Sequence, residues 1–219
     1  MLTLKEIMSN HEVNTYISIA NKHLGAMGFT EHSFRHVNLV AGLARRILKE
    51  LDYSERDQEL ASIAGYLHDI GNVISRHDHG QSGALLAYYI LDKMAMPPEE
   101  IALIISAIGN HEEQYGYPVN HIAASLILAD KSDVHRDRVR NRDISKFDIH
   151  DRVNYGAEQS FILINKKEKT ITMVLKIDLS ITTVMEYFEI FLTRMIMCRR
   201  AASHLQCHFG LIINDSRLL

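Results

Sequence analysis

The stretch Ala-Gly-Tyr-Leu-His-Asp-Ile-Gly-Asn, residues 64–72, ends an apolar helical run with a histidine and an aspartate side by side. Apolar residues precede the pair at the i, i+3, i+4, i+7 spacing of a helix face that packs in a core: Leu60, Ile63, Ala64 and Leu67. Gly71 would end this helix, as a residue that tolerates left-handed dihedral angles. We therefore expect His68 and Asp69 near a helix end, close to the core, where other helices could bring further metal ligands.

The composition of the chain narrows the class of protein. A length of 219 residues suffices for one sizeable core, and the formal net charge of −3 gives no basic field that would favour nucleic acid or an anionic membrane. Cys198 and Cys207 have no metal-like spacing and suggest a reduced protein without a disulfide framework. The N-terminus lacks the apolar centre of a signal peptide, and the longest strongly apolar run, 101–108, is far shorter than the roughly 20 residues of a membrane span. We expect a cytoplasmic protein with neither a membrane nor a nucleic-acid polymer as partner.

The hydrophobic pattern predicts a mainly α fold in two parts. A helical core over 1–145 would contain helices over 3–24, through 37–48, from 54 to the central motif, over about 80–94, from 98 to near 109, and over about 121–135. An α+β extension over 146–219 would contain a helix over 146–159, strands over 161–164 and 170–177, a long helix over about 182–204 and a strand over 208–213. The extension is therefore either a β-hairpin or a three-stranded sheet with a long helix, and it is a candidate dimerisation element.

Six histidine and aspartate residues at helix ends of the core form a candidate metal site. Each lies on or beside a helical segment: His36, His68, Asp69, His79, His111 and Asp130. Nitrogen and oxygen ligands without a thiolate suit Fe, Mn, Zn, Co or Mg better than a structural zinc. A set of this size can hold two ions bridged by one carboxylate, and two such ions can clamp a phosphate and activate the water that attacks it.

At these residues the sequence resembles the HD-domain superfamily of metal-dependent phosphohydrolases, whose pattern is H…HD…D. His36, the doublet His68-Asp69 and Asp130 match this pattern, and the resemblance covers roughly residues 30–135. It implies an HD-type helical bundle and a phosphoester-cleaving activity.

Two further segments resemble the subset of the family that binds two metals. They are His79-Gly80-Gln81-Ser82-Gly83-Ala84 and Asn110-His111-Glu112-Glu113, the latter followed by Gly116-Tyr117-Pro118. The second segment is similar to the cyclic-dinucleotide phosphodiesterase branch, although Asn110 and Asn72 stand where that branch has His and Lys. The symmetrical dinucleoside-tetraphosphate hydrolases, with one histidine in this motif, are a comparable match.

The resemblance also implies roles. His36, His68, Asp69 and Asp130 would hold one metal, and His79 and His111 the second, with Asp69 as the bridge. One or two divalent ions are expected, with Fe or Mn favoured. A metal-activated water would attack phosphorus and pass its proton to Asp69 or to the metals, so that no side-chain nucleophile is required. We expect Asp69, His68 and Lys131, which follows Asp130, to act in catalysis.

A phosphate ester needs cations beyond the metals. The candidates for substrate binding are His32, Arg35, Lys131, Arg136, Arg138, Arg140 and Arg142, most of them in the charged run that follows Asp130. Arginines there could bind phosphate oxygens in bidentate fashion. Arg76, His77 and Asp78 lie in the loop after the doublet and could shape the rim of the pocket.

The sequence thus favours a metal-dependent phosphohydrolase that cleaves a phosphoester of a nucleotide or a related small molecule. Two alternatives stay open: a di-iron oxygenase on the HD scaffold, and a nucleotide-binding sensor without catalysis. The methionines and phenylalanines of the long C-terminal helix indicate either core or the interface of a homodimer.

Overall fold

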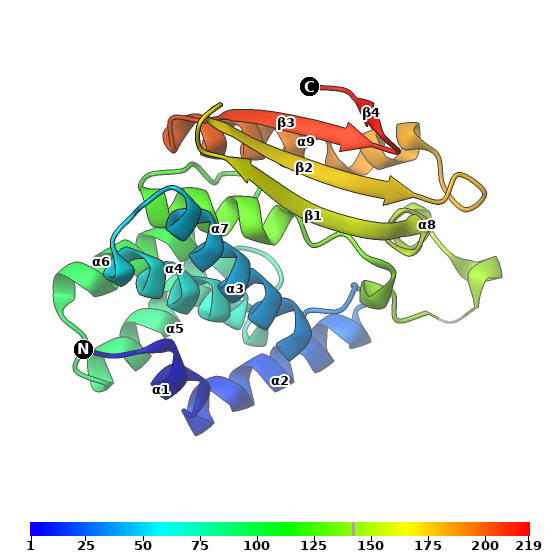
Figure 1. Cartoon of the computed structure of the whole chain (residues 1–219). Helices are drawn as coiled ribbons and strands as arrows, with labels where there is room; N and C mark the ends of the chain where they lie inside the picture. Colours follow the sequence, from blue (N-terminus) through cyan, green and yellow to red (C-terminus); the bar gives the residue numbers. More distant parts are fainter. Residues whose placement is uncertain (142) are drawn as a thin grey trace.

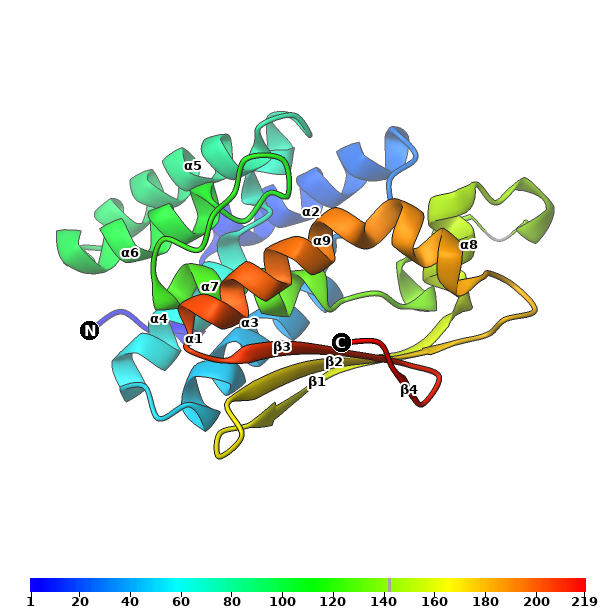
Figure 2. The same cartoon turned by 90° about the horizontal axis from the view of Figure 1, so that it is seen from above.

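The computed structural model describes residues 1–141 and 143–219. A bundle of helices packs beside a mixed four-stranded sheet (Figure 1). The long helix α9 (Val184–His204) contacts α7 (His121–Lys131) of the bundle and also two strands of the sheet (Figure 2). The fold is therefore mainly helical with a small α+β part at its C-terminal end, as the sequence predicts.

The remaining helices follow the predicted order. Their bounds are α1 (Leu4–Met8), α2 (His11–Ala26), α3 (Phe34–Glu50), α4 (Glu55–Leu67), α5 (His79–Lys93), α6 (Pro98–Gly109) and α8 (Ile149–Gly156), with short 3-10 helices η1 (Ile70–Val73), η2 (Arg136–Arg138) and η3 (Ile144–Lys146). The single helix predicted over 3–24 is wrong, because Asn10 starts a new helix by accepting hydrogen bonds from the backbone of Glu12 and Val13. The helix predicted to reach about residue 135 ends at Lys131, where the Ser132 hydroxyl donates to the carbonyl of Ala129.

Helices α3 and α4 pack closely together, and this contact positions the centre of the molecule. The apolar positions of both predicted faces are buried: Val37, Val40, Ala41, Ala44, Ile47 and Leu48 in α3, and Leu60, Ile63, Ala64 and Leu67 in α4. Gly65 of α4 lies against α3, since a Cβ there would stand 2.8 Å from the Cα of Ala41. The two backbones therefore approach as only glycine allows, which brings His36 of α3 beside His68 at the end of α4.

Gly71 has a different role from the one predicted. The expected left-handed conformation is wrong, because Gly28 is the glycine with positive φ among the described residues. Gly71 lies in η1 instead, where a Cβ would collide with the carbonyl oxygen of His79 and stand 2.5 Å from the nitrogen of Gly83. The absence of a side chain lets η1 pack directly on the first turn of α5, so that His79 lies next to the doublet.

The sheet combines antiparallel and parallel pairs in the order β1-β2-β3-β4. The strands are β1 (Ala157–Asn165), β2 (Thr170–Ile177), β3 (His208–Ile213) and β4 (Ser216–Arg217), and β2 and β3 are parallel across the α9 connection. The predicted hairpin and third strand are confirmed, whereas β4 was not predicted. The helix expected over 146–159 is too long, because Ala157 already pairs with Ile177 and the carbonyl of Gly156 accepts from the nitrogen of Asp178.

One hydrophobic core joins the two parts. Buried apolar side chains form a single cluster from Ile7 in α1 to Ile213 in β3. Phe191, Met195 and Met197 of α9 are buried within this chain, so these three residues belong to the core rather than to an interface. The division near residue 145 and the homodimer stay predictions. Among the described helices, none has the length and apolar character that crossing a membrane requires.

Candidate metal centre

Six buried polar side chains meet where the ends of several helices converge. His36 lies at the start of α3, His68 and Asp69 directly follow α4, and the other three come from α5, the end of α6 and α7: His79, His111 and Asp130. Apolar helix faces carry each backbone into the core, and the polar side chains stand at the helix ends. The structure thus brings together all six side chains that the sequence suggests as metal ligands.

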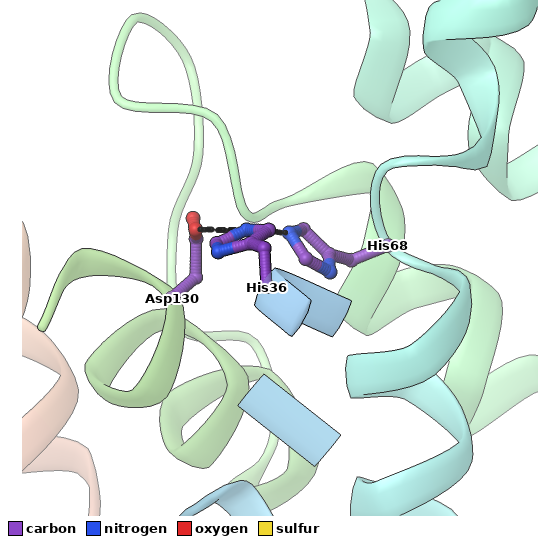
Figure 3. Close-up of side chains that lie close together, drawn as sticks. All are labelled: His36, His68 and Asp130. Atoms are coloured by element: carbon purple, nitrogen blue, oxygen red, sulfur yellow. Dashed lines mark hydrogen bonds and ion pairs between the residues drawn. The ribbon is translucent and has the colours of Figure 1, made fainter. Parts of the chain in front are cut away.

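The first group of ligands contains His36, His68 and Asp130, which point toward one another (Figure 3). The Nε2 atoms of His36 and His68 are 3.2 Å apart. Asp130 Oδ1 lies 3.4 Å from His36 Nε2 and 3.6 Å from His68 Nε2. These three ligand atoms all lie within 4.8 Å of one another, which is close enough for a single ion between them.

The second group contains His79 and His111, and Asp69 lies between the two groups. The Nε2 atoms of His79 and His111 are 3.1 Å apart, and Asp69 Oδ1 is 3.3 Å from the first and 4.0 Å from the second. The other oxygen, Asp69 Oδ2, is 3.5 Å from His36 Nε2 and 3.3 Å from His68 Nε2. Each carboxylate oxygen of Asp69 therefore faces its own pair of histidines.

All four histidines present the same ring nitrogen to the centre, because Nδ1 of each ring donates to a fixed acceptor. His36 donates to Asp133 Oδ2 at 2.7 Å, and the other three donate to backbone carbonyls: His68 to Gly65 (2.8 Å), His79 to Arg76 (3.1 Å) and His111 to Ile108 (2.6 Å). A proton on Nδ1 leaves the lone pair of Nε2 free as a ligand. The rings are thus held in the orientation that a metal needs, with Nε2 of each facing the centre.

The electrostatics of the centre favour positive charge. Burial alone would lower the pKa of His36 and of His68, but the surrounding carboxylates raise these pKa values to about 9 and about 10. Burial would raise the pKa of Asp69 and of Asp130, yet their cationic neighbours hold both well below the usual range. Burial and the charges of nearby histidines lower the pKa of His111 to about 3. Ionised carboxylates in a buried site require cations beside them.

A metal ion fits this set of donors. Asp69 Oδ2 is buried and has no hydrogen-bond partner among the described residues. Two nitrogens bound to one ion at about 2.1 Å and at right angles would be about 3.0 Å apart, close to the Nε2 separations of 3.2 and 3.1 Å. The donors are nitrogen and carboxylate oxygen, which Fe, Mn, Zn and Co accept.

Three side chains around the ligands were not assigned to the site from the sequence. Asp133 accepts from His36 and from Arg35, whose nearest nitrogen is 2.8 Å away. The Asn72 amide donates to Asp69 Oδ1 at 2.9 Å, and Glu112 Oε2 lies 3.3 Å from His79 Nδ1. Glu112 adjoins a ligand in the sequence and Asp133 follows Asp130 by three residues, but neither position carries a pattern that would single it out.

A cavity of about 430 Å³ opens on the centre. Its wall includes four of the candidate ligands and six further cationic or imidazole side chains: His32, Arg76, His77, Lys131, Arg138 and Arg194. Burial and the charge of Arg138 lower the pKa of His32 well below its usual range. The cavity thus places cationic side chains beside the ligand cluster, together with the carboxylates of Asp78, Glu112 and Glu113.

Arg194 of α9 reaches the cavity although the sequence gave it no role. Glu113 Oε1 lies 2.7 Å from Arg194 Nε and 3.2 Å from Lys131 Nζ. Lys131 Nζ in turn lies 2.7 Å from Asp130 Oδ2. A chain of ion pairs therefore connects the C-terminal helix to one of the metal ligands.

The predicted substrate-binding cations separate into two sets. His32, Lys131 and Arg138 line the cavity, as do Arg76, His77 and Asp78 of the predicted rim. The other three do not line the cavity, because their guanidinium groups lie against other partners: Arg35 against Glu31 and Asp133, Arg136 against Glu158 and the ring of Tyr155, and Arg140 against Asn21 and the carbonyl of Phe29. Arg142 lies outside the described residues.

The fold and the site together define a helical protein with a buried histidine–aspartate centre, and comparison with known proteins gives its family. A sequence model of the HD domain matches residues 31–153, which is more than half of the chain. The chain belongs to the HD-domain family, whose members bind divalent metals and are generally metal-dependent hydrolases.

The chain is also similar to an uncharacterized protein of Methanocaldococcus jannaschii. The two are 31% identical over 169 residues, which is 66% of this chain and 64% of that protein. The chain therefore spans less than two thirds of the length of this relative. Because the relative is uncharacterized, the similarity agrees with the family and names no substrate.

Proposed function

We propose that the protein is a phosphohydrolase with two metal ions that cleaves a phosphoester of a nucleotide or a related small molecule. The observation that carries this proposal is the position of Asp69, because its two oxygens face two different histidine pairs. His36, His68 and Asp130 would hold one ion, His79 and His111 the other, and Asp69 both. Iron or manganese suits these ligands.

The side chains of the cavity would bind and orient the substrate. Bound ions would supply Lewis-acid activation of the phosphoryl group and of an attacking water. The guanidinium groups of Arg76 and Arg194 would bind phosphate oxygens, since arginine forms paired hydrogen bonds with such anions. Lys131 lies against Asp130 and keeps that carboxylate ionised, so that it stays a ligand.

The test is a comparison of the wild type with Asp69→Ala and with a control, Asp137→Asn, whose carboxylate is 63% exposed. The wild type should contain up to two ions per chain and cleave a chromogenic phosphodiester or release phosphate from nucleotides only when metal is present. Asp69→Ala should lose most of the metal and the activity, whereas Asp137→Asn should keep both. Full activity and metal content in Asp69→Ala would rule the proposal out.

Two other functions use nearly the same ligands. A di-iron oxygenase would consume oxygen and give a mixed-valent iron signal, while hydrolysis under strictly anaerobic conditions with Mn²⁺ would count against it. A nucleotide sensor would bind nucleotides without turning them over. The cationic side chains at the cavity favour the hydrolase over the oxygenase, because they would serve to bind an anionic substrate.

A further inference from the structure

A second cavity of about 360 Å³ adjoins the one that opens on the metal ligands. Six side chains line both cavities and form the boundary between them: Phe29, His32, Arg76, Glu113, Arg138 and Arg194. A substrate bound at the metal ligands could thus extend past these arginines into the second cavity. Its size lies within the range of roughly 300–1,000 Å³ that small-molecule sites occupy.

Aromatic rings hold two of the arginines at this boundary. The guanidinium carbon of Arg194 lies 4.2 Å from the centroid of the Phe191 ring, and that of Arg76 lies 5.4 Å from the centroid of Phe29. Contacts between a cation and a ring keep a guanidinium group in place without using its hydrogen-bond donors. Phe29, which is 40% exposed, gives the second cavity a flat apolar wall, to which Met27 and Ile190 add, whereas Phe191 is buried beneath Arg194.

The second cavity also has a polar end, built by the start of α8. Asp148, His150, Asp151 and Asn154 line it. Asp148 caps the helix by accepting from the backbone nitrogen of Asp151 at 2.8 Å, which fixes the two acids near each other. Burial and the charge of Asp148 raise the pKa of Asp151. A ligand that donates hydrogen bonds would be favoured here, and an additional phosphate would be repelled.

We propose, on the basis of the hydrolase function above, that the second cavity binds the leaving group of the substrate as a nucleoside whose base carries an amino group. The phosphate would stay with the arginines and the metal ligands, the flat base would lie along Phe29, and its amino group would donate to Asp148 and Asp151. The α8 and α9 segments would therefore select the substrate, and nucleoside monophosphates would be preferred to dinucleoside polyphosphates.

Equilibrium binding of phosphonate analogues, which cannot be hydrolysed, to the metal-loaded protein tests this proposal without depending on turnover. Isothermal titration calorimetry would compare the phosphonate analogue of adenosine 5′-monophosphate with the analogues of ribose 5-phosphate, which lacks the base, and of inosine 5′-monophosphate, which has an oxygen in place of the amino group. Stacking and charge-assisted hydrogen bonds should make adenosine monophosphate at least about tenfold tighter than ribose 5-phosphate. It should also bind tighter than inosine monophosphate.

Variants identify the residues responsible. Asp148→Asn with Asp151→Asn removes both charges and keeps a residue that can cap α8. This double variant should lose about tenfold in affinity for adenosine monophosphate, lose the preference over inosine monophosphate, and bind ribose 5-phosphate as the wild type does. Asp92→Asn, a change at an exposed acid on α5, should change none of the three affinities.

Three results would overturn the inference. The wild type could bind adenosine monophosphate and ribose 5-phosphate with equal affinity, or bind neither. The double variant could lose the same factor of affinity for both compounds. Such results beside metal-dependent cleavage of a simple chromogenic ester would leave the proposed hydrolase intact. A preference for adenosine monophosphate in a protein that cleaves no ester would contradict the hydrolase and keep the nucleoside site.

Discussion

Asp133 is the most informative residue to change, because it connects the ligand His36 to two arginines without being a ligand itself. Its Oδ2 accepts from His36 Nδ1 at 2.7 Å and from Arg35 at 2.8 Å, and lies 3.8 Å from Arg138 NH1. In Asp133→Asn, an amide nitrogen facing His36 would force the ring proton onto Nε2, the ligand atom. If the amide oxygen faced His36 instead, the N–H donors of the amide would face the guanidinium group of Arg35, which is itself a donor.

The expected cost has two components. Changing the partner that orients a metal-bound histidine typically lowers metal affinity about 10–100-fold, which corresponds to about 1.4–2.7 kcal/mol. Removing the charge of a buried ion pair costs about 3–5 kcal/mol of folding stability. We expect about 3 kcal/mol, because Arg35 is 32% exposed and keeps its pair with Glu31. For a protein of this size that lowers Tm by roughly 6–12 °C.

The assay is a competitive titration of Mn²⁺ or Fe²⁺ against a chromogenic chelator, with the fold checked by circular dichroism. Asp133→Asn should bind the ion at the His36 group about 10–100-fold more weakly. The control Asp137→Asn changes an exposed acid of the same segment and should match the wild type. Unchanged metal affinity in a folded Asp133→Asn protein would refute the role of Asp133 in orienting His36.

Three further predictions concern packing, metal removal and thiol chemistry. Gly71→Ala should lower the free energy of unfolding by about 1–3 kcal/mol or more and weaken metal binding at His79, because the new methyl group collides with the carbonyl of His79. The control Gly42→Ala in α3 meets no atom within 4 Å and should raise the free energy of unfolding by about 0.8–1 kcal/mol. Equal Tm values for the two variants would contradict this reasoning. Removing metal by dialysis against a chelator should lower Tm in a way that added Mn²⁺ reverses, by about 2.7 kcal/mol of stability at 100 times the dissociation constant; a Tm independent of metal would count against a metal centre. Burial raises the pKa of Cys198 to about 12 and raises that of Cys207. At pH 8 about one Cys198 in ten thousand is therefore a thiolate, and mass spectrometry should find iodoacetamide on both cysteines only after unfolding. Rapid labelling of the native protein would contradict this prediction.

The sequence could indicate which six side chains converge, because their positions depend on local structure. Each ligand stands at or near the end of an apolar helical run, and the periodicity of those runs can be read from the chain. The residues that begin the helices are also local signals: the Ser54 side chain accepts from the backbone nitrogen of Asp57 at the start of α4, and Pro98 is the first residue of α6. The apolar periodicity and the helix caps together determine which side chains face the core.

The residues that support the ligands could not be predicted, because they depend on contacts between distant segments. Asp133 meets His36 across 97 residues of sequence, and Arg194 meets Glu113 across a similar stretch. The run of arginines after Asp130 was predicted to bind substrate from its charge alone, and charge does not show which way a side chain points. The turn after α7 leads Arg136 and Arg140 to other partners. Gly71 was expected to end a helix through its own backbone conformation. Glycine is required there for a different reason, which is the close tertiary contact with α5.

The central claim is that Asp69 bridges two ions, one with each histidine pair. The most direct test is a crystal structure with anomalous data collected at the absorption edges of the bound metals. We predict two anomalous peaks per chain, one bounded by His36, His68 and Asp130 and the other by His79 and His111, each next to a different oxygen of Asp69. A single peak in the fully metal-loaded protein, or two peaks of which only one contacts Asp69, would contradict the account.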